Sequence, residues 1–212
     1  MMIKIALSMG QEYIKDRNET RDFIDNKLIY FLKKSLNCEI FLINNFNKIN
    51  KSNVRNLNKF LNSNKINLIV LSGGQNIGTN KLRDSTEINL IKFALKKKIS
   101  LIGFCRGMQL INIFFKGSLK KINGHVSKIN KIYDLKNEKI KKKICYHGNG
   151  ILKLGKGLKI QHKSIDNEIE SFVHKSLKIL GVMWHPERAK IFDYDDIKLI
   201  KKFFSNKWEE LY

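Results

Sequence analysis

The sequence predicts an α/β fold with a mostly parallel sheet, helices on both of its faces and a β-rich elaboration in the C-terminal half. Short apolar runs alternate with segments of helical periodicity in the first half, which is typical of a covered parallel sheet. Short β-like runs separated by Gly, Asn and Lys then occupy roughly 118–184. A chain of 212 residues with 42% hydrophobic residues fits a single domain, 1–212.

The individual elements follow from these patterns. The apolar runs predict buried strands at 3–7, 39–43, 66–72 and 99–104. Helical spacing predicts a helix from Thr20 to Leu36, and Asp84 with Glu87 three residues later predicts an N-cap with a capping box. The remaining helices are expected at 54–63, 106–115 and 194–208, and the helix that Asp84 begins is expected to run to residue 98.

The formal charge of +22 does not by itself indicate a nucleic-acid-binding protein. Lysine is scattered through every segment together with Asn and Ile, a composition that A- and T-rich codons produce. We therefore expect no nucleic-acid partner, although an anionic small substrate is compatible with the charge. The lysine-rich run at 136–144 is expected to be a solvated loop or hairpin edge.

The cysteines and the apolar runs indicate the cellular compartment in which the protein is expected. Cys38, Cys105 and Cys145 are odd in number and widely spaced, which predicts neither a disulfide framework nor a zinc cluster. No run approaches the length of a membrane span, and the N-terminus lacks the features of a signal peptide. We expect a cytoplasmic protein without metal, cofactor or membrane partner, with Cys38 and Cys145 as inert packing residues.

The segment GFCRGMQ, residues 103–109, carries the first chemical signal. Its G-x-C-x-G spacing matches a nucleophile elbow with cysteine in the place of serine, in which Gly103 and Gly107 are the small neighbours of a sharp turn. The N-terminus of the following helix favours a thiolate over a thiol. The rival interpretation is that Cys105 is only a small core residue.

Two further loops complete the pattern. GVMWHPER, residues 181–188, places the single proline between His185 and Glu187, and so offers a base and an orienting carboxylate for Cys105. LSGGQNIG, residues 71–78, follows a buried strand, so the N–H groups of Gly74 and Arg106 are candidates for an oxyanion hole. A phosphate-binding loop is disfavoured because no G-K-[ST] follows.

Together these loops resemble the class I glutamine amidotransferase superfamily, over essentially the whole chain. The resemblance implies a flavodoxin-like fold and attack by Cys105 on a γ-glutamyl amide. A γ-glutamyl thioester would follow, and water would hydrolyse it. His185 would act as base and then acid, Glu187 would orient it, and Gln109 and Gly73 would contact the substrate.

YHGNGI, residues 146–151, is similar to a segment of free-standing γ-glutamyl-γ-aminobutyrate hydrolases. ETRDFID, LRDSTE, GH at 124–125 and WHPER are most similar to the branch that includes γ-glutamyl-CDP-amidate hydrolase. This resemblance makes His147 and His125 candidates for substrate contact. The chain departs from the pattern at Ile144 and Cys145, which replace Asn-Ser, and at Asn76, which replaces an acid.

Several alternatives stay open at this stage. The substrate is a small γ-glutamyl conjugate under the hydrolase interpretation, whereas a glutaminase would deliver ammonia to a synthetase partner; a homodimer is compatible with either. Arg21, Asp22, Arg83 and Asp84 either bind an anionic leaving portion or, as the stronger interpretation, cap and charge helix starts. Trp184 is expected to close a strand end beside the site.

Overall fold

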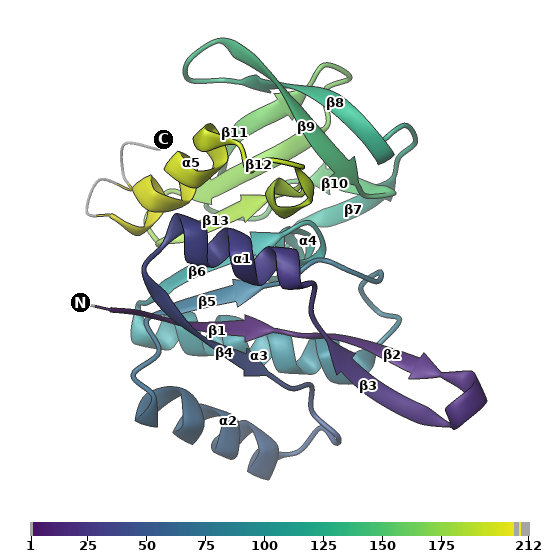
Figure 1. Cartoon of the computed structure of the whole chain (residues 1–212), viewed down its shortest axis with the longest axis vertical. Helices are drawn as coiled ribbons and strands as arrows, with labels where there is room; N and C mark the ends of the chain where they lie inside the picture. Colours follow the sequence, from purple (N-terminus) through teal and green to yellow (C-terminus); the bar gives the residue numbers. More distant parts are fainter. Residues whose placement is uncertain (1, 206–207, 209–212) are drawn as a thin grey trace.

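The computed structural model describes residues 2–205 and 208. Within them, the central sheet has nine strands in the order β4-β1-β5-β6-β13-β12-β11-β8-β9 (Figure 1). The first five strands in this order are parallel: β4 (Cys38–Ile43), β1 (Ile3–Ser8), β5 (Leu68–Leu71), β6 (Ser100–Phe104) and β13 (Ile179–Val182). The predicted parallel half of the sheet is confirmed.

The C-terminal half continues the same sheet with antiparallel strands. These strands are β12 (Ile169–His174), β11 (Leu158–Ser164), β8 (Val126–Asp134) and β9 (Lys139–Tyr146). The lysine-rich run at 136–144 therefore lies in the β8–β9 hairpin and in the outermost strand, as predicted. Two small ribbons pair β7 (Ser118–Lys121) with β10 (Asn149–Lys153), and β2 (Gly10–Ile14) with β3 (Glu19–Phe23).

Helices cover both faces of the parallel strands because the strand residues alternate in direction. Ile5, Leu7, Val70 and Phe104 pack with α1 (Asn26–Ser35) and α5 (Tyr194–Phe204). Ala6, Ile69, Leu71 and Leu101 point to the opposite face and pack with α2 (Lys51–Ser63), α3 (Lys81–Lys97) and α4 (Arg106–Phe114). The inner strands β1, β5, β6 and β13 are thus buried on both sides, which explains their almost continuous apolar sequences.

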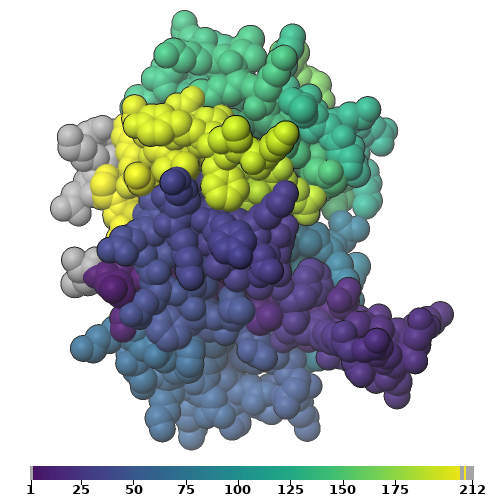
Figure 2. All heavy atoms as spheres, in the orientation of Figure 1, coloured from purple at the N-terminus to yellow at the C-terminus, as the bar shows by residue number. Residues whose placement is uncertain are grey.

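The helix predicted from Thr20 is wrong at its start. Residues 19–23 form β3, whose hairpin with β2 projects from the body of the molecule (Figures 1 and 2). Phe23 lies across Gly10, where an added Cβ would come within 2.7 Å of the ring. The helix begins only at Asn26, because the Asp25 side chain caps it by accepting a hydrogen bond from the Lys27 amide.

The predicted cap at Asp84 is also wrong, because α3 begins at Lys81. Asn80 is the N-cap, and its side chain accepts a hydrogen bond from the Arg83 amide at 3.0 Å. Asp84 instead accepts from the Gly78 amide at 2.8 Å. The last helix, expected over 194–208, is described as α5 up to Phe204, and residues 206–207 of that prediction lie outside the described residues. None of the helices in the described part is both long and apolar enough to cross a membrane.

Candidate active site

Cys105 lies at a sharp turn between β6 and α4. Its backbone has φ 47° and ψ −105°, a combination that L residues rarely adopt and that occurs at nucleophile elbows. An added Cβ would come within 2.5 Å of the Gly107 backbone at Gly103, and within 2.4 Å of the Leu71 carbonyl oxygen at Gly107. Both glycines are therefore required by close backbone approach, as the G-x-C-x-G spacing predicted.

His185 follows β13, the parallel neighbour of β6. The register that pairs Val182 with Phe104 brings the two strand ends together, and the Cys105 amide donates to the Val182 carbonyl at 2.7 Å. His185 Nδ1 and Glu187 Oε1 are 2.6 Å apart, and the thiol of Cys105 is the other side chain that interacts with the ring. Three predicted residues from two distant segments thus meet beyond the carboxyl ends of adjacent strands.

The electrostatics of His185 match this arrangement. Burial lowers its pKa, but hydrogen bonds to Cys105 and Glu187, together with the charge of those partners, outweigh burial and raise the pKa to about 9. A protonated imidazole is thereby favoured at neutral pH. The backbone of His185 is held by its own amide, which donates to the Ile144 carbonyl at 2.9 Å.

The glycine loop after β5 lies against the same two side chains. A Cβ added at Gly73 would be 3.1 Å from His185 Cε1 and 3.6 Å from Cys105 Cβ, so only glycine leaves the space between them open. Gly74 has φ 131°, a conformation that favours glycine. The structure therefore brings Gly73 to the cysteine and the histidine, and Gly74 follows directly in the same loop.

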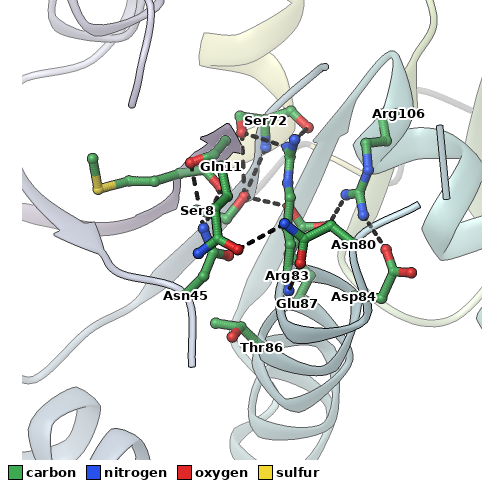
Figure 3. Close-up of polar contacts among 12 residues, drawn as sticks. Ser8, Gln11, Asn45, Ser72, Asn80, Arg83, Asp84, Thr86, Glu87 and Arg106 are labelled. Carbon is green, nitrogen blue, oxygen red and sulfur yellow. Dashed lines mark hydrogen bonds and ion pairs between the residues drawn. The ribbon is translucent and has the colours of Figure 1, made fainter. Parts of the chain in front are cut away.

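A buried ionic cluster supports this loop (Figure 3). The Arg83 guanidinium donates to the carbonyl oxygens of Ser72 at 3.2 Å and Gly73 at 2.7 Å. Arg83 also pairs with Glu87 at 3.1 Å, and Glu87 and Asp84 both bind the guanidinium of Arg106. One carboxylate, Glu87, therefore connects the glycine loop to Arg106, the residue that follows Cys105.

The sequence left open whether Arg83 and Asp84, and likewise Arg21 and Asp22, bind a leaving group or have a structural role. Arg83 is fully buried with its guanidinium turned into the protein, which favours the structural interpretation over contact with a leaving group. Arg21 and Asp22 lie in β3, so the prediction that they begin a helix is wrong. Arg21 pairs with Glu19 on the surface, while Asp22 accepts from the Asn45 amide at 2.7 Å and ties the hairpin to the body.

A pocket opens beside His185 and Glu187 on the hairpin side. His185, Glu187 and Gly73 line it together with Gly10 and Phe23 from the base of the hairpin. Arg188 also lines the pocket and lies over the Tyr146 ring, 4.2 Å from its centroid. A cation next to the site could therefore meet an anionic part of a ligand.

Gln109 and Asn76 both connect to the segment after β9. Gln109 is buried and donates from Nε2 to the Asn149 carbonyl at 3.0 Å. The Asn149 side chain donates to Asn76 Oδ1 at 2.7 Å, so Asn76 holds this segment to the glycine loop. Contact of Gln109 with a substrate stays a prediction.

His125 and His147 lie together with two residues that sequence reasoning did not connect to them. Both rings are buried, and each faces the carboxylate of Glu170, as does the thiol of Cys145. The adjacent carboxylate of Glu170 raises the pKa of His125 to about 9, by more than burial lowers it. Substrate contact by either histidine stays a prediction and would need a ring to turn away from Glu170.

Trp184 packs toward α5 rather than forming part of the pocket wall. Its indole N–H donates to Asp196 at 3.1 Å, and its ring lies 5.3 Å from that of His162. Burial lowers the pKa of His162 to about 4, so this histidine is neutral at physiological pH. Trp184 therefore anchors the last helix behind the strand end that carries His185.

Comparison with known proteins decides the family. Residues 23–206 match the family described as glutamine amidotransferase class-I. This chain belongs to that family. It is 34% identical over 146 residues to γ-glutamyl-CDP-amidate hydrolase of Campylobacter jejuni, a match that covers 66% of this chain and 70% of the relative. The family resemblance and its flavodoxin-like fold are thus confirmed.

Other relatives show the range of the family. The chain is 29% identical over 128 residues to a subunit of the glutamine-hydrolysing GMP synthase of Methanocaldococcus jannaschii, a match that covers 57% of this chain and 64% of that protein. A solved glutamine amidotransferase from Thermotoga maritima superimposes with a TM-score of 0.62 at 16% identity, over 100% of this chain and 94% of that one. The latter likeness concerns the fold alone.

Proposed function

We propose that this chain is a cysteine-dependent hydrolase that cleaves a γ-glutamyl amide bond and releases glutamate. The observation that supports it best is the His185 ring, which contacts Glu187 through Nδ1 and has Cys105 as its other partner, beside an open pocket. A nucleophile, a base and an orienting carboxylate in this relation are the parts that acyl transfer requires.

The reaction would proceed in two steps. The Cys105 thiolate attacks the γ-carbonyl carbon, and His185 gives its proton to the departing amine as the C–N bond breaks. Water then attacks the γ-glutamyl thioester, His185 takes a proton from it, and the C–S bond breaks to regenerate the thiolate. The N–H groups of Gly74 and Arg106 would stabilise the negative oxygen in both steps.

The leaving group is proposed from the relatives and the pocket together. A γ-glutamyl-linked nucleotide amidate such as γ-glutamyl-CDP-amidate is our first candidate, because a relative with that name is 34% identical. Arg188 at the pocket fits its negative charge. γ-Glutamyl-γ-aminobutyrate is the second candidate substrate.

A glutaminase that supplies ammonia to a synthetase is the second candidate function. The observation in its favour is the similarity to a glutamine-hydrolysing synthase subunit. The two functions differ in what they require: a free-standing hydrolase acts alone on a conjugate, whereas such a glutaminase hydrolyses glutamine strongly only with its partner.

The test compares purified protein on γ-glutamyl-CDP-amidate, γ-glutamyl-γ-aminobutyrate, a γ-glutamyl anilide and glutamine, with release of glutamate as the readout. We expect turnover of at least one conjugate, its loss in Cys105→Ala and its retention in Cys38→Ala. Hydroxylamine should divert the thioester to γ-glutamyl hydroxamate. Equal turnover by Cys105→Ala would overturn the mechanism, and strong glutamine hydrolysis only after a synthetase partner is added would favour the glutaminase.

A further inference from the structure

Four buried side chains that take no part in the proposed reaction lie close together next to the active site. They are His125, Cys145, His147 and Glu170, with exposed fractions of 1%, 0%, 3% and 0%. One ligating atom from each lies within 4.8 Å of every other. A two-histidine, one-cysteine, one-carboxylate set is a donor combination suited to zinc.

Three separations from the Glu170 carboxylate are close to those of a tetrahedral centre, and all four ligand atoms lie within 4.8 Å of one another. Glu170 Oε1 lies 3.0 Å from His125 Nδ1 and 3.4 Å from His147 Nε2, and Glu170 Oε2 lies 3.9 Å from Cys145 Sγ. Bonds of about 2.0–2.3 Å to one tetrahedral zinc ion put neighbouring ligand atoms about 3.3–3.8 Å apart. The cluster therefore needs only small adjustments to hold an ion at its centre.

The atoms that face the centre also lack hydrogen-bond partners. Within the described residues, His125 Nδ1, His147 Nε2 and Glu170 Oε1 are buried side-chain atoms without a hydrogen bond of acceptable geometry. Buried polar atoms are rarely left this way, because each costs free energy. A cation at the centre would satisfy all three at once.

The ring nitrogens that face away from the centre are, in contrast, both engaged. His125 Nε2 lies 2.9 Å from Asp166 Oδ2, and His147 Nδ1 lies 3.2 Å from the Asn149 carbonyl oxygen. Histidines that bind metals regularly donate their second ring N–H to a carboxylate or a backbone carbonyl. The nitrogens left to bind an ion are therefore His125 Nδ1 and His147 Nε2, the two that face Glu170.

The backbone already holds the four residues in place. The His147 amide donates to the His125 carbonyl at 3.0 Å, and the Met183 amide donates to the Glu170 carbonyl at 2.7 Å. Cys145 lies at the end of strand β9, and Glu170 lies within β12. The set is thus assembled by strand pairing and does not require a loop to close.

We propose that His125, Cys145, His147 and Glu170 bind one zinc ion in a closed, structural site. The thiolate and the carboxylate balance the charge of the ion, and four protein ligands leave no position for a water nucleophile. The ion would fix the segment from Ile144 to Asn149, which holds the His185 amide at one end and the Gln109 side chain at the other. Zinc binding here does not depend on the proposed reaction.

The test is metal analysis of the intact chain expressed in zinc-supplemented medium and dialysed. We expect about one zinc ion per chain, falling below about one tenth in Cys145→Ala and in His147→Ala. Cys38→Ala and Cys105→Ala are matched controls that should retain the ion, and the second excludes binding at the active-site cysteine. Asp166→Asn should weaken zinc binding by about 10- to 100-fold.

Cobalt provides a second readout. Cobalt-loaded protein should show tetrahedral d–d bands and a thiolate charge-transfer band that Cys145→Ser abolishes and Cys38→Ser preserves, with circular dichroism to verify that each variant is folded. Folded wild-type protein that takes up neither zinc nor cobalt would overturn the inference. Retention of zinc by folded Cys145→Ala together with loss in Cys105→Ala would overturn it as well.

Discussion

Replacing Glu87 with Gln should lower the free energy of unfolding by more than the same substitution at the surface does. Glu87 is fully buried, accepts from Ser8 at 2.9 Å and pairs with both Arg83 and Arg106. Glutamine keeps the volume but removes the charge, so two buried guanidinium groups are left with Asp84 as their remaining acidic partner in the cluster. Breaking a buried pair from one side costs about 3–5 kcal/mol.

This cost corresponds to a fall in melting temperature of about 6–20 °C, because 1 kcal/mol shifts a domain of this size by about 2–4 °C. Urea denaturation followed by circular dichroism measures the free energy directly. The matched control is Glu39→Gln, which breaks an exposed pair with Lys4 at 3.6 Å and should cost less than about 1 kcal/mol. If Glu87→Gln is no less stable than the control, the buried cluster does not stabilise the glycine loop as we describe.

Two further predictions concern the elbow and the histidine. Gly103→Ala forces a Cβ to within 2.5 Å of the Gly107 backbone and should destabilise the protein by about 1–3 kcal/mol or more, whereas Gly148→Ala, with its nearest atom at 3.9 Å, should be close to neutral in the same denaturation assay. Because the pKa of His185 is raised to about 9 in the folded state, the stability it contributes is complete below about pH 6.5 and is lost as pH rises through about 9. His185 should therefore contribute a fall of roughly 3 kcal/mol in the free energy of unfolding across that window. A folded His185→Gln variant should lose this part of the slope and keep the part that comes from His125, whose pKa is also raised to about 9. A slope that is unchanged in His185→Gln would refute the assignment.

The turn at Cys105 could be predicted because the residue types that it requires lie close together in the sequence. Gly103, Cys105 and Gly107 lie within five residues, and the contacts that exclude a side chain at each glycine involve the backbone of that same turn and its neighbouring strand. The parallel sheet was predictable for a related reason, since strands buried on both faces have almost continuously apolar sequences.

The errors arose where local pattern and tertiary contact disagree. Thr20–Phe23 has helical spacing, yet these residues pair with β2, and Phe23 packs over Gly10. Asp84 has the spacing of a capping box, yet Asn80 caps the helix and Asp84 binds Arg106. A single sequence does not reveal such competition, because the partner that wins is distant along the chain.

By itself, the sequence determined the family, the parallel α/β fold and the residues most capable of acyl chemistry, because each is expressed in short-range spacing and side-chain type. Only the tertiary structure decided which polar groups meet inside the protein. Insertion of β13 between β6 and β12 brings His185 to Cys105 on one side and Glu170 to His125, Cys145 and His147 on the other. These contacts depend on the order of the strands in the sheet. That order is determined by long-range packing and cannot be deduced from the spacing of residues within short segments.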